Sequence, residues 1–134
     1  MNSKEKKEKD EYSSIIVLDG PKSELPKSRM IGLFGDVDEE KTADVIHGML
    51  LLRECGKEEI YEDSADADPQ IKETIYKPID FYISTWGRDA RGMFAIYDVM
   101  RMVREEYTIN TYGLGKVMSA GVLLLAAGTK GKRK

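Results

Sequence analysis

The residues with the clearest potential for chemistry are a serine and its glycine neighbours near the C-terminal end of the sequence. Ser119 stands between Gly115 and Gly121, after a short strand-like segment and before an apolar run that begins at Val122. Small neighbours let a carbonyl group approach the hydroxyl, and the first turn of a helix offers unpaired N–H groups to developing negative charge. This pattern indicates a serine nucleophile, although an isolated serine of this kind is more often a plain helix N-cap.

The sequence around Ser119 resembles the active-serine segment of the Clp protease proteolytic subunit. That family reads Gly-Gln-Ala-Ala-Ser-Met-Gly-Ala, followed by an apolar helix that ends in Ala-Gly-Ala-Lys-Gly-Lys-Arg. Here Ser119 falls on the family's serine and residues 127–133 follow in near-identical form, while residues 96–100 resemble the family's Ile-Tyr-Asp-Thr-Met. The resemblance runs from about Arg29 to Lys134 with one interruption. It implies a serine-type endopeptidase with Ser119 as its nucleophile.

The resemblance also implies an oxyanion hole made of two backbone N–H groups. One is the amide of Ala120. The other belongs to the second glycine of the family's Ser-Pro-Gly-Gly, and Arg88 takes that position in this chain. An arginine can donate its N–H only if the backbone angles that glycine adopts are open to a residue with a Cβ. The departure predicts either a weakened oxyanion hole or an Arg88 side chain that fills a changed substrate cleft.

A serine nucleophile needs a base, and the base needs a carboxylate that orients it. In the family a histidine and an aspartate follow the Lys-Gly-Lys-Arg segment, and no histidine follows Ser119 here. His47, the single histidine, matches a non-catalytic helix position of the family. Cys55 lies in a helical pattern without a paired histidine, so we interpret its thiol as structural. We therefore expect the chain to lack the family's C-terminal part.

Three hypotheses follow from this expectation. The chain is an N-terminal portion of a peptidase whose remaining catalytic residues lie on another polypeptide, or it is a non-catalytic structural subunit of a mixed ring. The third hypothesis is a crotonase-like enzyme that acts on acyl thioesters. The sequence context of Ser119 argues against the third, because those enzymes need no serine there.

Hydrophobic periodicity predicts the elements that must position these residues. In chain order they are a strand at 30–34, a helix at 39–54, a strand at 79–84, a helix at 92–104, a strand at 108–112 and a helix after Ser119. Strands that alternate with helices predict an α/β fold with a parallel sheet and right-handed crossovers. The resemblance implies the superhelix of βαβ units shared by Clp peptidases and crotonases. Since residues 122–125 are all apolar, we expect the last helix to need cover from downstream sequence or neighbouring subunits.

The same patterns divide the chain into two parts. Residues 1–28 are predicted to be a flexible charged leader and N-terminal segment, which includes the apolar run 15–18. Residues 29–134 form one domain, with an acidic surface insertion at 57–77. The carboxylates of that insertion do not have the spacing of a calcium loop.

Composition limits the partners and the compartment. The 134 residues carry a net charge of −3, 41% are apolar and 34% are charged, which is typical of one globular domain and not of a nucleic-acid binder. No apolar run has the ~18 residues of a membrane span, and a single cysteine suits a cytoplasmic location. We predict no metal and no cofactor, and no phosphate-binding loop for ATP. The resemblance implies a ring-forming homo- or hetero-oligomer, an ATP-dependent unfoldase as partner, and unfolded polypeptides as substrates.

Overall fold

The computed structural model describes residues 28–62, 68 and 70–134, so the predictions for residues 1–27 lie outside the described residues. In chain order the elements are β1 (Met30–Phe34), α2 (Glu39–Glu54), β2 (Lys57–Tyr61), β3 (Ile71–Tyr76), β4 (Ile79–Thr85), α3 (Ala90–Val103), β5 (Ile109–Val117) and α4 (Ala120–Ala126). Every strand and helix that periodicity predicted between residues 29 and 134 is present. The strand before Ser119 is longer than predicted, because β5 continues through both of its glycines to Val117.

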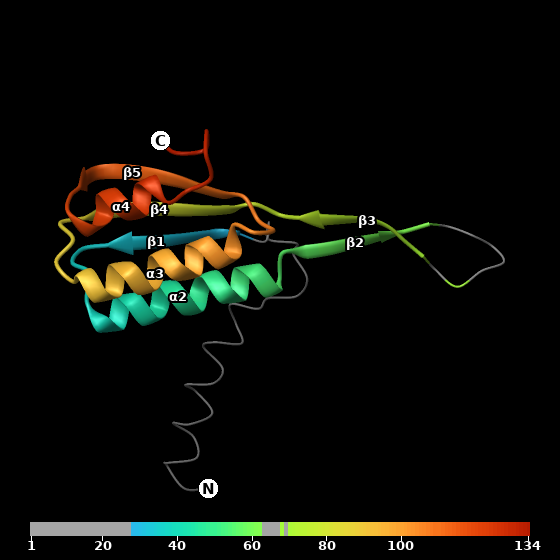
Figure 1. The fold of residues 1–134 in the computed structure, drawn as a ribbon, viewed down its shortest axis with the longest axis horizontal. Helices are drawn as coiled ribbons and strands as arrows, with labels where there is room; N and C mark the ends of the chain where they lie inside the picture. Colours follow the sequence, from blue (N-terminus) through green and yellow to red (C-terminus); the bar gives the residue numbers. More distant parts are fainter. Residues whose placement is uncertain (1–27, 63–67, 69) are drawn as a thin grey trace, which may run out of the picture.

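The predicted parallel sheet is confirmed as three strands in the order β1-β4-β5. Residues 30–34 of β1 pair with residues 80–84 of β4, and residues 79–83 of β4 pair with residues 109–113 of β5. Helices α2 and α3 pack beside each other along the sheet, and α4 packs against α3, β4 and β5 (Figure 1). Because all three strands run the same way, the loops that follow β1, β4 and β5 lie at the same end of the sheet, where the carboxyl ends of the strands meet.

The core between sheet and helices explains why these elements form. Side chains of β4 alternate, and its buried ones include Phe81 and Ile83, which are fully enclosed. Met49 of α2 and Ile96 of α3 are equally enclosed on the helix side. Burying each such side chain contributes about 1.5–3 kcal/mol. This core fixes the strands and therefore the positions of their carboxyl-terminal loops.

Residues 57–77 contain two strands that the sequence analysis did not predict. β2 and β3 form an antiparallel hairpin with an irregular register between Ile60 and Tyr61, and it extends beyond the end of the parallel sheet (Figure 1). Its residues are mostly exposed. The strands escaped prediction because charged residues hide the alternation that marks a half-buried strand.

Helix α4 is only partly covered by the described residues. Leu124 is fully buried, Leu123 and Leu125 are half-buried, and Val122 is 54% exposed. The chain after α4 returns to β5, where Thr111 and Arg133 form a parallel bridge. The further cover expected for this helix stays a prediction. No helix within the described ranges is both long and apolar enough to span a bilayer.

Candidate active site

Ser119 lies on a tight connection between a strand and a helix. Val117 ends β5, Met118 follows, and α4 begins at Ala120. The Met118 N–H donates to the Thr85 carbonyl at 3.0 Å, which ties the connection to the end of β4. The Gly121 N–H donates to the Met118 carbonyl at 2.9 Å and closes the first turn. The serine is thereby held at the edge where the loops of the parallel strands meet.

The backbone of Ser119 is strained. Its φ is 50° and its ψ is −119°, values that cost a residue with a Cβ about 1–3 kcal/mol. An ordinary capping serine has extended angles and its side chain accepts a hydrogen bond from the helix. Ser119 has neither feature, since its side chain makes no capping bond and is exposed. A strained serine between a strand and a helix is instead the geometry of a nucleophile elbow.

The loop after β4 approaches the serine through a glycine. Gly87 has a φ of 96°, and a Cβ added to it would lie 2.8 Å from the Cβ of Ser119 and 2.9 Å from the N atom of Ala120. It would also lie 3.0 Å from the carbonyl oxygen of Met118. Contacts this short with backbone atoms are not tolerated, so the loop can approach Ser119 this closely only because residue 87 is glycine.

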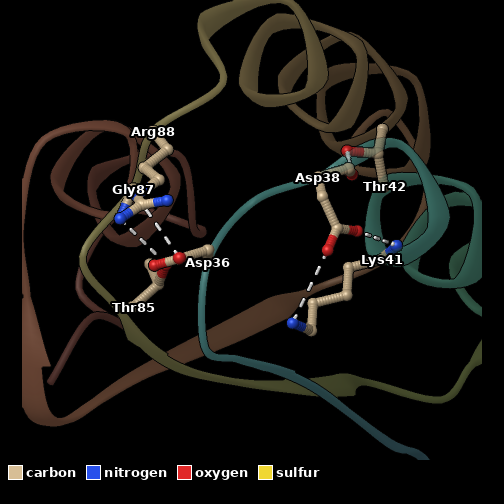
Figure 2. A network of polar contacts seen from close by, with 7 residues as sticks. All are labelled: Asp36, Asp38, Lys41, Thr42, Thr85, Gly87 and Arg88. Atoms are coloured by element: carbon tan, nitrogen blue, oxygen red, sulfur yellow. Dashed lines mark hydrogen bonds and ion pairs between the residues drawn. The ribbon is translucent and has the colours of Figure 1, made fainter.

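Three elements hold Gly87 in place. Its N–H donates to the hydroxyl oxygen of Thr85 at 2.9 Å, and that threonine is fully buried at the end of β4 (Figure 2). Its carbonyl accepts from the Val37 N–H at 2.7 Å, from the loop that follows β1. On its third side lies the turn from Met118 to Ala120. The ends of β1, β4 and β5 thus all meet at this glycine.

Two N–H groups beside this contact are available to bind negative charge. Within residues 28–62, 68 and 70–134, neither the Arg88 N–H nor the Ala120 N–H has a hydrogen-bond acceptor. Arg88 follows Gly87 directly, and Ala120 opens α4, where the first N–H groups of a helix have no partner within the helix. The structure therefore brings the three residues predicted for the site into one place. Their catalytic roles stay predictions.

The Arg88 side chain turns toward the loop after β1. Its Nε lies 3.3 Å from Oδ2 of Asp36, and the arginine side chain is 77% exposed (Figure 2). The φ of Arg88 is 95°, a value in the left-handed region that usually favours glycine. Arg88 adopts it in spite of its Cβ, so its N–H remains a candidate donor.

The other reactive side chains lie elsewhere. His47 is exposed on α2, the helix that packs against α3 and β1, and Cys55 ends that helix as an exposed free thiol. Neither belongs to the loops that surround Ser119. Among the residues that the structure describes, no group of three His, Cys, Asp or Glu side chains is arranged to hold a metal ion.

Replacing Arg88 with glycine is expected to stabilise the fold. Glycine removes backbone strain of about 1–3 kcal/mol, and this gain is reduced by its freer unfolded chain and by the lost exposed ion pair, each worth about 1 kcal/mol or less. With the strain at about 3 kcal/mol and both costs at about 1 kcal/mol, the net rise in the free energy of unfolding is about 1 kcal/mol, measurable by urea denaturation. Arg88→Ala is the matched control, because it loses the ion pair and keeps a Cβ at residue 88. Equal stability of the two variants contradicts this account.

Sequence reasoning missed Gly87 as a contact of Ser119 and Thr85 as its anchor. A signal for both was present. Thr85 ends a strand whose alternate residues are buried, and a glycine follows two positions later, which is the arrangement in which a threonine hydroxyl accepts a hydrogen bond from the backbone. Asp36 was also missed, since nothing in the sequence pairs it with Arg88.

The chain is similar in sequence to proteins of the Clp protease family. A sequence model of the Clp protease family matches residues 71–134. The ATP-dependent Clp protease proteolytic subunit 2 of Mycobacterium tuberculosis is 35% identical over 124 residues, which are 92% of this chain and 49% of that protein. Subunit 3 of Frankia casuarinae is 34% identical over 113 residues, which are 84% of this chain and 44% of that protein. The chain thus spans about half the length of the curated relatives it matches.

A solved structure has the same fold. The crystal structure of the ClpP protease catalytic domain from Plasmodium falciparum matches with a TM-score of 0.60 at 24% identity, over 78% of this chain and 48% of that chain. At this identity the likeness supports the fold alone. It agrees with the parallel sheet and helices described above.

Proposed function

Because this chain belongs to the Clp protease family, we propose that it carries the nucleophile of a serine endopeptidase. The Ser119 hydroxyl attacks the carbonyl carbon of a peptide bond, and the Arg88 and Ala120 N–H groups bind the oxygen that becomes negative. The observation that carries the proposal is the strained backbone of Ser119, packed against Gly87 without a capping bond.

The strain at Ser119 has a chemical use. A serine hydroxyl that capped its helix would be occupied as a hydrogen-bond acceptor and turned toward the helix amides. At φ 50° Ser119 is exposed instead, and its turn contacts Gly87, the residue before the Arg88 N–H. A carbonyl group that enters there meets the nucleophile and the oxyanion donors together, which is the arrangement that acyl transfer requires.

The base that accepts the serine proton is assigned by resemblance alone. The family places a histidine and an aspartate after the Lys-Gly-Lys-Arg segment, and the matched relatives are about twice as long as the region they share with this chain. His47 is not proposed for this role, since it lies on the exposed side of α2. The histidine and aspartate are therefore expected on the half of the subunit that the match does not cover.

The substrates and partners are proposed from family membership. We propose that the active assembly is a ring of homologous subunits in the cytoplasm, that it encloses the serine sites in a chamber, and that an ATP-dependent unfoldase delivers unfolded polypeptides to it. The names of the relatives support this view, because they describe proteolytic subunits of ATP-dependent proteases.

A fluorophosphonate probe tests the proposed nucleophile. The probe is added to the 134-residue chain alone and to the chain mixed with the unmatched half of the mycobacterial relative, and intact mass with peptide mapping locates the adduct. We expect an adduct on Ser119 in the mixture, little or none in the chain alone, and none in Ser119→Ala. Absence of the adduct in both samples contradicts a nucleophilic Ser119 and favours a structural subunit.

A further inference from the structure

The loop after β1 is joined to the loop after β4 at two successive residues. The Val37 N–H donates to the Gly87 carbonyl at 2.7 Å. Asp36 Oδ2 lies 3.3 Å from Arg88 Nε (Figure 2). One residue earlier, the Gly35 N–H donates to the Ser84 carbonyl at 3.0 Å. The two loops therefore run side by side up to the proposed oxyanion donor.

The first of these contacts sets the direction of the Arg88 N–H. The Gly87 carbonyl and the Arg88 N–H belong to one peptide group, and in a trans peptide they point in opposite directions. Since the carbonyl faces Val37, the Arg88 N–H faces away from the β1 loop. The loop after β1 thus orients an amide that belongs to a different strand.

The second contact helps to hold Arg88 in its strained conformation. A residue with a Cβ leaves a φ of 95° unless its surroundings hold it there. When φ relaxes by a turn of the peptide group between Gly87 and Arg88, the N–H turns out of its direction. The ion pair with Asp36 restrains the side chain of that same residue, from the loop that already holds the preceding carbonyl.

We propose that Asp36 is a positioning residue for the oxyanion hole. By pairing with the Arg88 guanidinium it keeps Arg88 in the glycine-like conformation in which its N–H can bind the oxyanion. The inference rests on the proposed function, and it assigns a role to a residue that touches neither Ser119 nor a substrate. It also gives a reason why an arginine is accepted at this position, since Asp36 compensates for the missing glycine.

Backbone dynamics of the ¹⁵N-labelled 134-residue chain test the proposal without any need for activity. In Asp36→Asn the order parameter of the Arg88 amide is expected to fall from the rigid range near ~0.85 to below ~0.6. High salt, which screens exposed ion pairs, should shift the parent in the same direction. Asp38→Asn is the matched control, because it removes a neighbouring carboxylate while asparagine still caps α2.

The Arg88→Gly background separates positioning from a general structural role. Glycine adopts the positive φ without help, so adding Asp36→Asn to Arg88→Gly should change nothing further at residue 88 or at Ala120. An unchanged Arg88 amide in Asp36→Asn, an equal loss in Asp38→Asn, or an equal further loss in the glycine background each overturns the proposal.

Labelling of Ser119 gives the functional counterpart. Asp36→Asn is expected to slow fluorophosphonate addition by up to about fivefold, the factor that corresponds to about 1 kcal/mol for an exposed ion pair. The same substitution should have no effect in Arg88→Gly. If Ser119 is not labelled in any variant, the proposed function fails, and the dynamics of the Arg88 amide still decide whether Asp36 holds it.

Discussion

Replacing Ser119 with glycine is expected to abolish fluorophosphonate labelling and, at the same time, to raise the free energy of unfolding. The serine has a φ of 50° and a ψ of −119°, and relief of that strain is worth about 1–3 kcal/mol. Glycine also lowers the free energy of unfolding by about 0.4–1 kcal/mol, because it increases the conformational entropy of the unfolded chain. No capping bond is lost. We expect a net gain of about 0.5–2 kcal/mol by urea denaturation, with complete loss of the adduct by intact mass.

Ser119→Ala is the control that separates the two effects. Alanine removes the hydroxyl and keeps the Cβ, so labelling should be lost without a gain in stability. If Ser119 were only a helix cap, Ser119→Ala would lower the free energy of unfolding by about 1 kcal/mol. Ser119→Gly would lower it by a few tenths of a kcal/mol, and neither variant would stabilise the fold. A glycine variant less stable than the parent therefore contradicts the strained geometry and restores the capping interpretation.

The elements were predictable from the sequence because local patterns determine them. Alternation marks β4, and apolar residues at helical spacing mark α2 and α3, while Asp38 and Asp89 cap those helices as the residue types suggest. A parallel sheet followed from the alternation of strands and helices. The β2–β3 hairpin did not follow, because its strands carry charges where an apolar alternation would have identified them.

The candidate site could be predicted only in part. The position of Ser119 and its two proposed donors followed from resemblance, but the strain at Ser119 depends on contacts between residues distant in sequence. Gly87 presses against the serine turn, and Asp36 reaches Arg88 across the two loops. Contacts of this kind arise when the sheet brings strand ends together, and local sequence patterns do not reveal them. The glycine-like φ of Arg88 is a further example, since arginine by itself predicts the opposite.

Ser119 and Arg88 are both strained, and they lie on either side of the contact between Gly87 and the serine turn. Each residue is held at a positive φ by neighbours that are themselves fixed by β1, β4 and β5. Strain of this kind persists only where the surrounding structure determines the conformation. The site should therefore be more sensitive to changes in Gly87, which lies between the two residues, than to changes at any exposed glycine.

Replacing Gly87 with alanine is expected to cause a large loss of Ser119 labelling. The new Cβ would meet the Ser119 Cβ at 2.8 Å, the Ala120 nitrogen at 2.9 Å and the Met118 oxygen at 3.0 Å, and the φ of 96° disfavours it as well. The loop must move, which displaces the Arg88 N–H from the serine. We expect labelling of Ser119 to fall by about 10²–10³, the usual effect of losing one oxyanion donor. Destabilisation should reach about 2–5 kcal/mol, since backbone strain and overpacking add.

Gly115→Ala is the matched control for this prediction. Gly115 has a φ of 64°, and a Cβ added there meets no atom within 4 Å in the described structure. It should cost only the backbone term of about 1–2 kcal/mol and leave the labelling rate near that of the parent. The difference between the two alanine variants then measures the contact between the β4 loop and the serine turn. Similar labelling rates in the two variants would show that Gly87 does not control the geometry around Ser119.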